Sequence, residues 1–331
     1  MTAPWISAQL RQLLAQRGHA WLLQGPSGLG QYKLALGMAQ AWLCDEPTAD
    51  GACGRCGSCH QVEVRAHTDL AVLMPETVMM DLGWPLGEKA QADIDDKKRK
   101  PSKEIRVEAM RDMLEFAQRT SGRGRGKVVL VYPAERMNQV TANALLKTLE
   151  EPPGDVRFVL ASEAAHQLLP TIRSRCQAHT LAWPAAAEAE AWLREEGVPP
   201  AAAPVLLRAA GGRPEDALRL HQAGLDARAW SQWPRALVRG DMAAVANWSP
   251  AQLVESLQKL CHDLLAVRSG AAPRFFEAAD LPQAGSVSAL TGWWGQLAET
   301  SRTVEHPFNA GLMLEDLVAQ ARAALNSKAY P

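Results

Sequence analysis

This sequence lacks several features that mark membrane proteins, secreted proteins and proteins that wrap nucleic acid. It has no run of about 18 apolar residues, so we expect no membrane span. The opening MTAPWISAQLRQLL has no basic segment followed by a long apolar run, so we expect no signal peptide and a cytoplasmic location. The net charge is −1, so any contact with nucleic acid would have to come from a local patch.

Cysteine is also scarce, with six residues in 331. Four of them lie close together in the sequence: Cys44, Cys53, Cys56 and Cys59. Their C-x8-C-x2-C-x2-C spacing is typical of zinc ligands, because four thiolates surround the ion tetrahedrally and leave no open position for water. We therefore predict one structural zinc ion. His60 and His67 are less favoured substitute ligands, and a set of free buried thiols is the alternative to metal binding.

The chain does contain enough apolar residues for more than one core. Hydrophobic residues make up 47% and charged residues 21%, and the length favours two or three domains. Apolar segments at 20–23, 69–74, 127–137 and 156–162 are predicted strands. They alternate with predicted helices at 32–44, 105–119 and from 141 to the proline at 152. This alternation predicts a doubly wound α/β domain whose parallel sheet has helices on both faces.

Two other regions interrupt or follow this pattern. Residues 75–102 are predicted to form an irregular insertion, and its basic run KKRK at 97–100 is interpreted as a solvated loop. After Pro184 we expect only helices. In one of them Ser249 is the predicted N-cap, and the last is predicted at about 307–325. The fold class is therefore α/β followed by all-α.

The segment GPSGLGQYK resembles a nucleotide-binding loop that has lost two working groups. The pattern G-x-x-x-x-G-K-[ST] needs a lysine for the phosphates and a hydroxyl for magnesium. Gln31 stands at the lysine position and Tyr32 at the hydroxyl position. The candidate residues of this degenerate loop are Gly25, Gly28, Gly30, Gln31 and Tyr32. A strand before the loop and a helix after it give the context that such a loop requires.

Four motifs occur together in one order: the degenerate loop, the four cysteines, NALLKTLEEPP at 143–153, and SRC at 174–176. In this combination the chain resembles the δ′ family of bacterial clamp loader subunits, AAA+ proteins of the DNA polymerase III holoenzyme. The resemblance implies a RecA-like AAA+ domain at 1–183 with a zinc module at 44–59. It further implies a helical lid domain at 184–225 and a helical collar domain for oligomerisation at 226–331.

The same resemblance implies that this subunit does not hydrolyse ATP. Tyr132 and Pro133 stand where active relatives carry the acidic pair that holds magnesium, and Glu215 stands where they carry a phosphate-sensing arginine. Arg213 lies nearby and is not favoured as a substitute. The residues are compatible both with weak nucleotide binding through the backbone N–H groups of the degenerate loop and with its absence. An active ATPase of the γ/τ type is the main alternative.

The resemblance implies that the chain keeps an arginine finger, Arg175, with Ser174 and Cys176 as its motif. In the family this arginine acts in trans on a neighbour's ATP, and Arg173 is its rival here. Asn143 and Lys147 are expected to frame that interface.

The implied partners are γ/τ and δ in a hetero-pentamer and, indirectly, the β sliding clamp and primed DNA. The subunit would act as a stator in clamp loading during DNA replication. The subunit would belong to a DNA-directed DNA polymerase, which is a nucleotidyltransferase, as a member of that complex.

Direct DNA contact is a separate hypothesis. Arg123, Arg125 and Lys127 are predicted to lie in a glycine-rich turn where they could meet phosphates. A zinc-ribbon nucleic-acid binder is a third interpretation of the chain. The cysteine stretch argues against it, because it holds the acids Asp45, Glu46 and Asp50 and only one base, Arg55.

Overall fold

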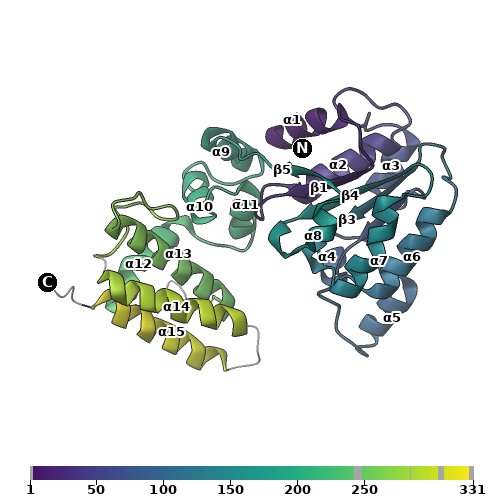
Figure 1. Ribbon diagram of the computed structural model, residues 1–331. Helices are drawn as coiled ribbons and strands as arrows, with labels where there is room; N and C mark the ends of the chain where they lie inside the picture. Colours follow the sequence, from purple (N-terminus) through teal and green to yellow (C-terminus); the bar gives the residue numbers. More distant parts are fainter. Residues whose placement is uncertain (1–2, 242–247, 284, 305–308, 328–331) are drawn as a thin grey trace. The chain divides into compact units, whose positions relative to one another are not determined.

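The computed structural model of the chain describes residues 3–241, 248–283, 285–304 and 309–327. The chain divides into two compact units, Met1–Pro184 and Ala185–Pro331, and each is described by itself (Figure 1). None of the helices in the described ranges is long and apolar enough to cross a lipid bilayer.

The first unit is built on a five-stranded sheet in the order β2-β3-β4-β1-β5, with every pairing parallel. The strands are β1 (Ala20–Gln24), β2 (Leu70–Leu73), β3 (Lys127–Val131), β4 (Val156–Ser162) and β5 (Gln177–Thr180). Strands β3 and β4 are almost continuously aliphatic, because both faces of the sheet are covered.

Helices cover both faces of this sheet (Figure 1). The helices of this unit are α1 (Pro4–Leu14), α2 (Gln31–Leu43), α3 (Gly57–Glu63), α4 (Glu76–Asp81), α5 (Glu88–Asp95), α6 (Val107–Gln118), α7 (Gln139–Glu150) and α8 (Pro170–Arg173). Val128 packs with Ala39 of α2 on one face, and Val129 packs with Met113 of α6 and Leu145 of α7 on the other. Successive residues of β3 thus serve two cores, as the doubly wound prediction requires.

The structure contains elements that the sequence patterns did not predict. Strand β5 pairs with β1, but its side chains are mostly exposed and carry no apolar alternation that could signal a strand. Helix α1 was also not predicted, and the insertion predicted to be irregular contains α4 and α5. The predicted strand at 127–137 was too long, since β3 ends at Val131 and a short 3₁₀ turn follows at Ala134–Arg136.

The insertion also departs from the prediction at its basic run. Arg99 was interpreted as part of a solvated loop, but its side chain is only 24% exposed and pairs with the carboxylate of Glu76. The other members of KKRK are exposed, as expected. A charged residue becomes this buried when it gains a specific ionic partner.

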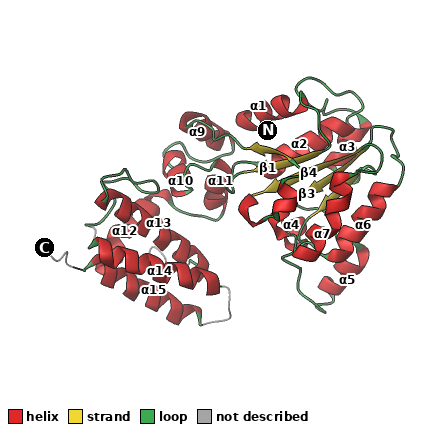
Figure 2. Cartoon of the chain, in the orientation of Figure 1, coloured by secondary structure: helices red, strands yellow, loops and turns green. Residues whose placement is uncertain are grey.

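In the second unit all secondary structure within the described ranges is helical (Figure 2). The helices are α9 (Ala186–Glu195), α10 (Ala203–Ala209), α11 (Pro214–Gln222), α12 (Ala227–Arg239), α13 (Pro250–Arg268), α14 (Val287–Thr303) and α15 (Ala310–Leu325). Ser249 caps α13 as predicted, in a capping box with Gln252. The predicted start of the last helix at 307 lies outside the described residues. The division into a lid and a collar stays a prediction.

Candidate functional site

The degenerate nucleotide loop lies at the carboxyl end of β1, where parallel α/β sheets commonly bind ligands. Helix α2 begins at Gln31, and its N-cap is Gly30. Gly30 has φ = 97°, a left-handed conformation that favours glycine, and Gly28 also has a positive φ. The backbone scaffold of a phosphate loop is therefore present, with the predicted glycines at its turns.

Gln31 closes this loop from the inside. Its side chain is 2% exposed, and its Nε2 donates hydrogen bonds to the carbonyl oxygens of Gly25 at 2.8 Å and Pro26 at 2.5 Å. A neutral amide bonded to the loop itself thus stands at the position of the phosphate-binding lysine. It offers no positive charge to a triphosphate.

Tyr32 is held in an aromatic cluster that joins three segments of the chain. Its hydroxyl accepts a hydrogen bond from Trp84 Nε1 at 2.7 Å, and its ring centroid lies 5.3 Å from that of Tyr132. Burial raises the pKa of Tyr32, so the phenol stays neutral at pH 7. Trp84 comes from the insertion, which therefore packs onto the degenerate loop. No pattern in the sequence predicts this contact.

The two positions after β3 also lack metal chemistry. The Tyr132 hydroxyl donates to Glu163 Oε1 at 2.8 Å, and Pro133 has no side-chain ligand. A nearby carboxylate, Glu135, accepts hydrogen bonds from the Ser162 hydroxyl at 2.8 Å and the Glu163 N–H at 3.1 Å. These groups are arranged to hold the end of the sheet together.

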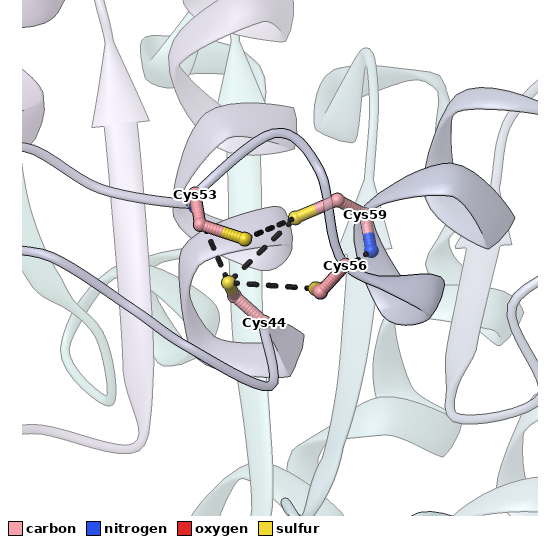
Figure 3. Close-up of side chains that lie close together, drawn as sticks. All are labelled: Cys44, Cys53, Cys56 and Cys59. Carbon is pink, nitrogen blue, oxygen red and sulfur yellow. Dashed lines mark hydrogen bonds between the residues drawn. The ribbon is translucent and has the colours of Figure 1, made fainter.

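The four predicted cysteine ligands lie together (Figure 3). Their sulfur atoms lie within 4.8 Å of one another, and the pairs 44–59, 44–56 and 53–59 are separated by 3.6, 3.8 and 3.9 Å. A regular tetrahedron with bonds of about 2.3 Å from metal to sulfur has edges of about 3.8 Å. The spacing of the thiols therefore fits a four-coordinate metal ion. His60 and His67 do not belong to the group formed by the described residues.

Two helix ends position these cysteines. Cys44 follows the last residue of α2, whereas Cys56 is the N-cap of α3 and accepts the N–H of Cys59 at 3.4 Å. The backbone N–H of Arg55 is the main cause that lowers the pKa of Cys53 to about 6, and burial raises the pKa of Cys59 to about 12. A bound cation would favour the thiolate form of all four.

The glycine-rich turn after α6 packs against this cysteine module. Arg123 forms an ion pair with Asp45 at 3.2 Å, and Arg125 donates to the carbonyl oxygen of Cys44 from Nε at 2.9 Å and Nη2 at 2.7 Å. The turn itself is held by Asp69, which accepts the N–H of Gly122 at 2.7 Å. Burial opposes the ionisation of Asp69, but the hydrogen bonds from the turn outweigh it and lower its pKa.

Lys127 is the first residue of β3, as the predicted strand at 127–137 requires, and does not lie in the turn with Arg123 and Arg125. Its side chain is buried, and Nζ donates to the carbonyl oxygen of Phe116 at 2.6 Å near the carboxyl end of α6. Each of the three cations considered for DNA contact therefore has a partner within the chain. Direct DNA contact stays a prediction.

Arg175 lies on the surface after α8, with its side chain 31% exposed. Its Nε donates to Glu150 Oε1 at 2.6 Å, and its Nη1 donates to the carbonyl oxygen of Thr171 at 2.9 Å. No sequence pattern predicts this contact of Glu150, although the residue lies within the TLEEPP segment. Ser174 and Cys176 flank the arginine, the former exposed and the latter partly buried against the sheet core.

Asn143 and Lys147 are both exposed on α7. Their spacing to Glu150 places all three on one side of the helix, beside Arg175. The structure therefore brings the NALLKTLEEPP and SRC motifs together at one surface. In the second unit Glu215 lies in the first turn of α11, and Arg213 Nε pairs with Asp216 at 2.9 Å.

The comparisons with known proteins agree with these motifs. Residues 5–184 match the family model described as "DNA polymerase III, delta subunit". The DNA polymerase III subunit delta' of Pseudomonas aeruginosa is 40% identical over 226 residues, which cover 67% of this chain and 62% of that protein.

Two further relatives come from other bacteria. The subunit delta' of Escherichia coli is 34% identical over 66% of this chain and 60% of its own length. The subunit tau of Salmonella typhimurium is 34% identical over 61% of this chain and 28% of its own length. The matched regions therefore span about three fifths of the two delta' relatives. The chain belongs to the DNA polymerase III δ′ subunit family.

Proposed function

We propose that this chain is a clamp loader subunit that hydrolyses no ATP itself and offers Arg175 to the ATP site of a neighbouring γ/τ subunit. The observation that carries the proposal is the closed nucleotide loop, in which the Gln31 amide binds the loop's own carbonyl oxygens. Phosphoryl transfer depends on fixed cations around the triphosphate, and this loop supplies none. The partly exposed Arg175 beside α7 then acts on a nucleotide held by the neighbouring subunit.

The chemistry of Arg175 suits this role. A guanidinium offered across an interface stabilises the charge that develops on the transferred phosphoryl group, with an effect of about 10³–10⁵ in rate. Its contact with Glu150 supports the role, because it limits the rotamers of a long side chain before the neighbour arrives.

The metal in the cysteine module is zinc, and its role is structural. The donor set of four thiolates supports this assignment, since closed Cys₄ sites are typical of structural zinc. The ion would hold the 44–59 segment at the end of α2.

The partners follow from the family. The chain would join γ/τ and δ in a hetero-pentamer, sit in it as the stator, and assist the loading of the β sliding clamp onto primed DNA. It would do so in the cytoplasm as a non-catalytic member of a DNA-directed DNA polymerase. The match to a tau subunit supports a common architecture for the partners.

The test replaces Arg175 with Ala in a reconstituted clamp loader. We expect single-turnover ATP hydrolysis at the adjoining site to fall by about 10³-fold and clamp loading to fall with it. The matched control is Arg173→Ala, an exposed arginine at the end of α8, two residues before Arg175. Equal activity of the Arg175→Ala complex and the unmodified complex would reject the proposal, as would ATP turnover by the isolated chain.

A further inference from the structure

A cavity of about 790 Å³ lies beside β2, one of the two edge strands of the sheet, and is walled by α4, α5 and α6. Much of this wall comes from the insertion at 75–102, for which the proposed function gives no role. The floor is apolar, with Val72, Met79, Leu86 and Phe116 among its residues. All four are only partly buried, so they leave apolar surface at the opening.

The rim of this cavity is fixed by a partly buried ionic cluster around Glu76. Glu76 accepts hydrogen bonds from Arg99 Nη1 at 2.5 Å and Nη2 at 2.8 Å, and from the N–H of Ser102 at 2.8 Å. Arg106 Nε lies 3.3 Å from the same carboxylate. The cluster ties the end of the insertion to the first turn of α4. A wall fixed in this way loses little conformational entropy when a ligand enters.

The wall carries an excess of negative charge. Six acidic and three basic residues line the cavity. Arg99 and Arg106 are both paired with Glu76, whereas Glu88, Glu108 and Asp112 form no ion pair with any residue that the structure describes. Glu108 and Asp112 lie one turn apart on α6, where like charges repel and destabilise a helix. A cationic ligand would relieve this repulsion.

We propose that this cavity binds a short protein segment in which apolar side chains are flanked by Lys or Arg. The apolar side chains would enter between Val72, Met79 and Phe116, and the cations would lie over Glu108 and Asp112. Charge complementarity identifies the occupant, because the unpaired charges around the apolar floor are mainly of one sign. The neighbouring edge strand can also offer backbone hydrogen bonds to an extended segment. This site is independent of Arg175 and of the nucleotide loop.

The test measures binding of a labelled synthetic peptide, in which Leu and Phe alternate with Lys, to the full chain. We expect saturable binding that weakens with added salt, and protection of β2 and α6 from amide hydrogen exchange. Replacing Lys by Glu in the peptide, or its apolar residues by Ser, should abolish binding. Equal binding of the three peptides, or no saturable binding of the first, would overturn the proposal.

Matched variants locate the site on the protein. Asp112→Lys should weaken peptide binding about tenfold, whereas Glu115→Lys on the same helix, outside the cavity, should change it less than about twofold. Met79→Glu should abolish binding, and Met80→Glu, at an adjacent exposed position, should not. Equal effects within either pair would contradict the assignment. The alternative is self-association of the chain through this cavity. Self-association that is lost in Asp112→Lys would contradict the assignment as well, because a second copy of the chain would then be the occupant.

Discussion

Gln31 binds the loop that surrounds it because a primary amide can donate two hydrogen bonds at once. Two carbonyl oxygens, those of Gly25 and Pro26, accept from one nitrogen. The sequence alone predicted that the loop lacked a lysine and a magnesium ligand. It could not predict that the substituted side chain would turn inward, because an amide pairs equally well with water.

This arrangement predicts the effect of Gln31→Glu. A carboxylate has nearly the shape of the amide but only accepts hydrogen bonds, so it would face two carbonyl oxygens without a donor. We expect the free energy of unfolding to fall by about 2 kcal/mol at pH 7. Urea denaturation followed by circular dichroism measures the change. Unchanged stability would show that the amide contributes nothing to the loop.

A second prediction at this scale concerns His67, whose Nδ1 accepts the N–H of Asp69 at 3.0 Å. Burial lowers the pKa of His67. In the native state its imidazole therefore stays neutral at pH values near 6.5, where the imidazole of the unfolded chain takes up a proton. The native state then binds fewer protons, and the free energy of unfolding should decrease as the pH falls from about 7 to 5. His179, whose pKa burial also lowers, adds a change of the same sign.

The measurement is the stability of His67→Asn across this pH range. Asn keeps an acceptor for the backbone N–H but does not titrate, so the dependence on pH should become shallower by at most about 1.4 kcal/mol per pH unit. His166→Asn, at an exposed position, should keep the original slope. Identical slopes for the two variants would contradict the assignment to His67.

At the scale of elements, the cysteine module illustrates what a pattern can and cannot predict. The spacing of the ligands predicted the cluster, because the cysteines are close in sequence and need only a turn or two to meet. The support from Arg123 and Arg125 was not predictable, since these residues are far from the cysteines in the chain. Strand β5 was not predicted for a related reason. Its pairing with β1 joins segments that are far apart in the chain, and that backbone pairing alone defines the strand.

The support from the arginines can be tested through the metal. Arg125→Ala removes two hydrogen bonds to the Cys44 carbonyl oxygen but no ligand, and we expect zinc to be held about tenfold more weakly. Competition with a chromophoric chelator measures the affinity. Arg55→Ala is the control, because this exposed arginine lies in the module and its side chain pairs with exposed Glu46 rather than with the Cys44 carbonyl oxygen. Tighter or unchanged zinc binding in Arg125→Ala would reject a supporting role.

At the scale of the whole molecule, the two units have separate cores. In the second unit, Asp263 is fully buried and its carboxylate accepts the backbone N–H groups of Arg274 at 2.9 Å, Phe275 at 2.7 Å and Phe276 at 2.9 Å. Phe276 stacks on Trp230, with 4.7 Å between ring centroids. One carboxylate therefore fixes the loop that completes this aromatic core.

Asp263→Ala should unfold the second unit selectively. Three buried N–H groups would lose their acceptor, which destabilises this unit by about 3 kcal/mol or more. Hydrogen exchange should show lost protection in α12, α13 and α14 and retained protection in β3 and β4. Asp280→Ala is the control, since that carboxylate has no hydrogen bond or ion pair with the part of the chain that is described. Loss of protection in the sheet as well would show that the two units unfold together.

The hydrogen bond from Trp84 to Tyr32 has a consequence for substitutions at positions 31 and 32. A threonine at position 32 alone would leave the largely buried indole N–H without its acceptor and remove the ring beside Tyr132. A lysine at position 31 alone would place a charge at a buried position inside the loop. Either change alone should therefore lower stability. The residues of the loop and of the insertion are coupled, and position 32 can change at little cost only together with its partner in the insertion.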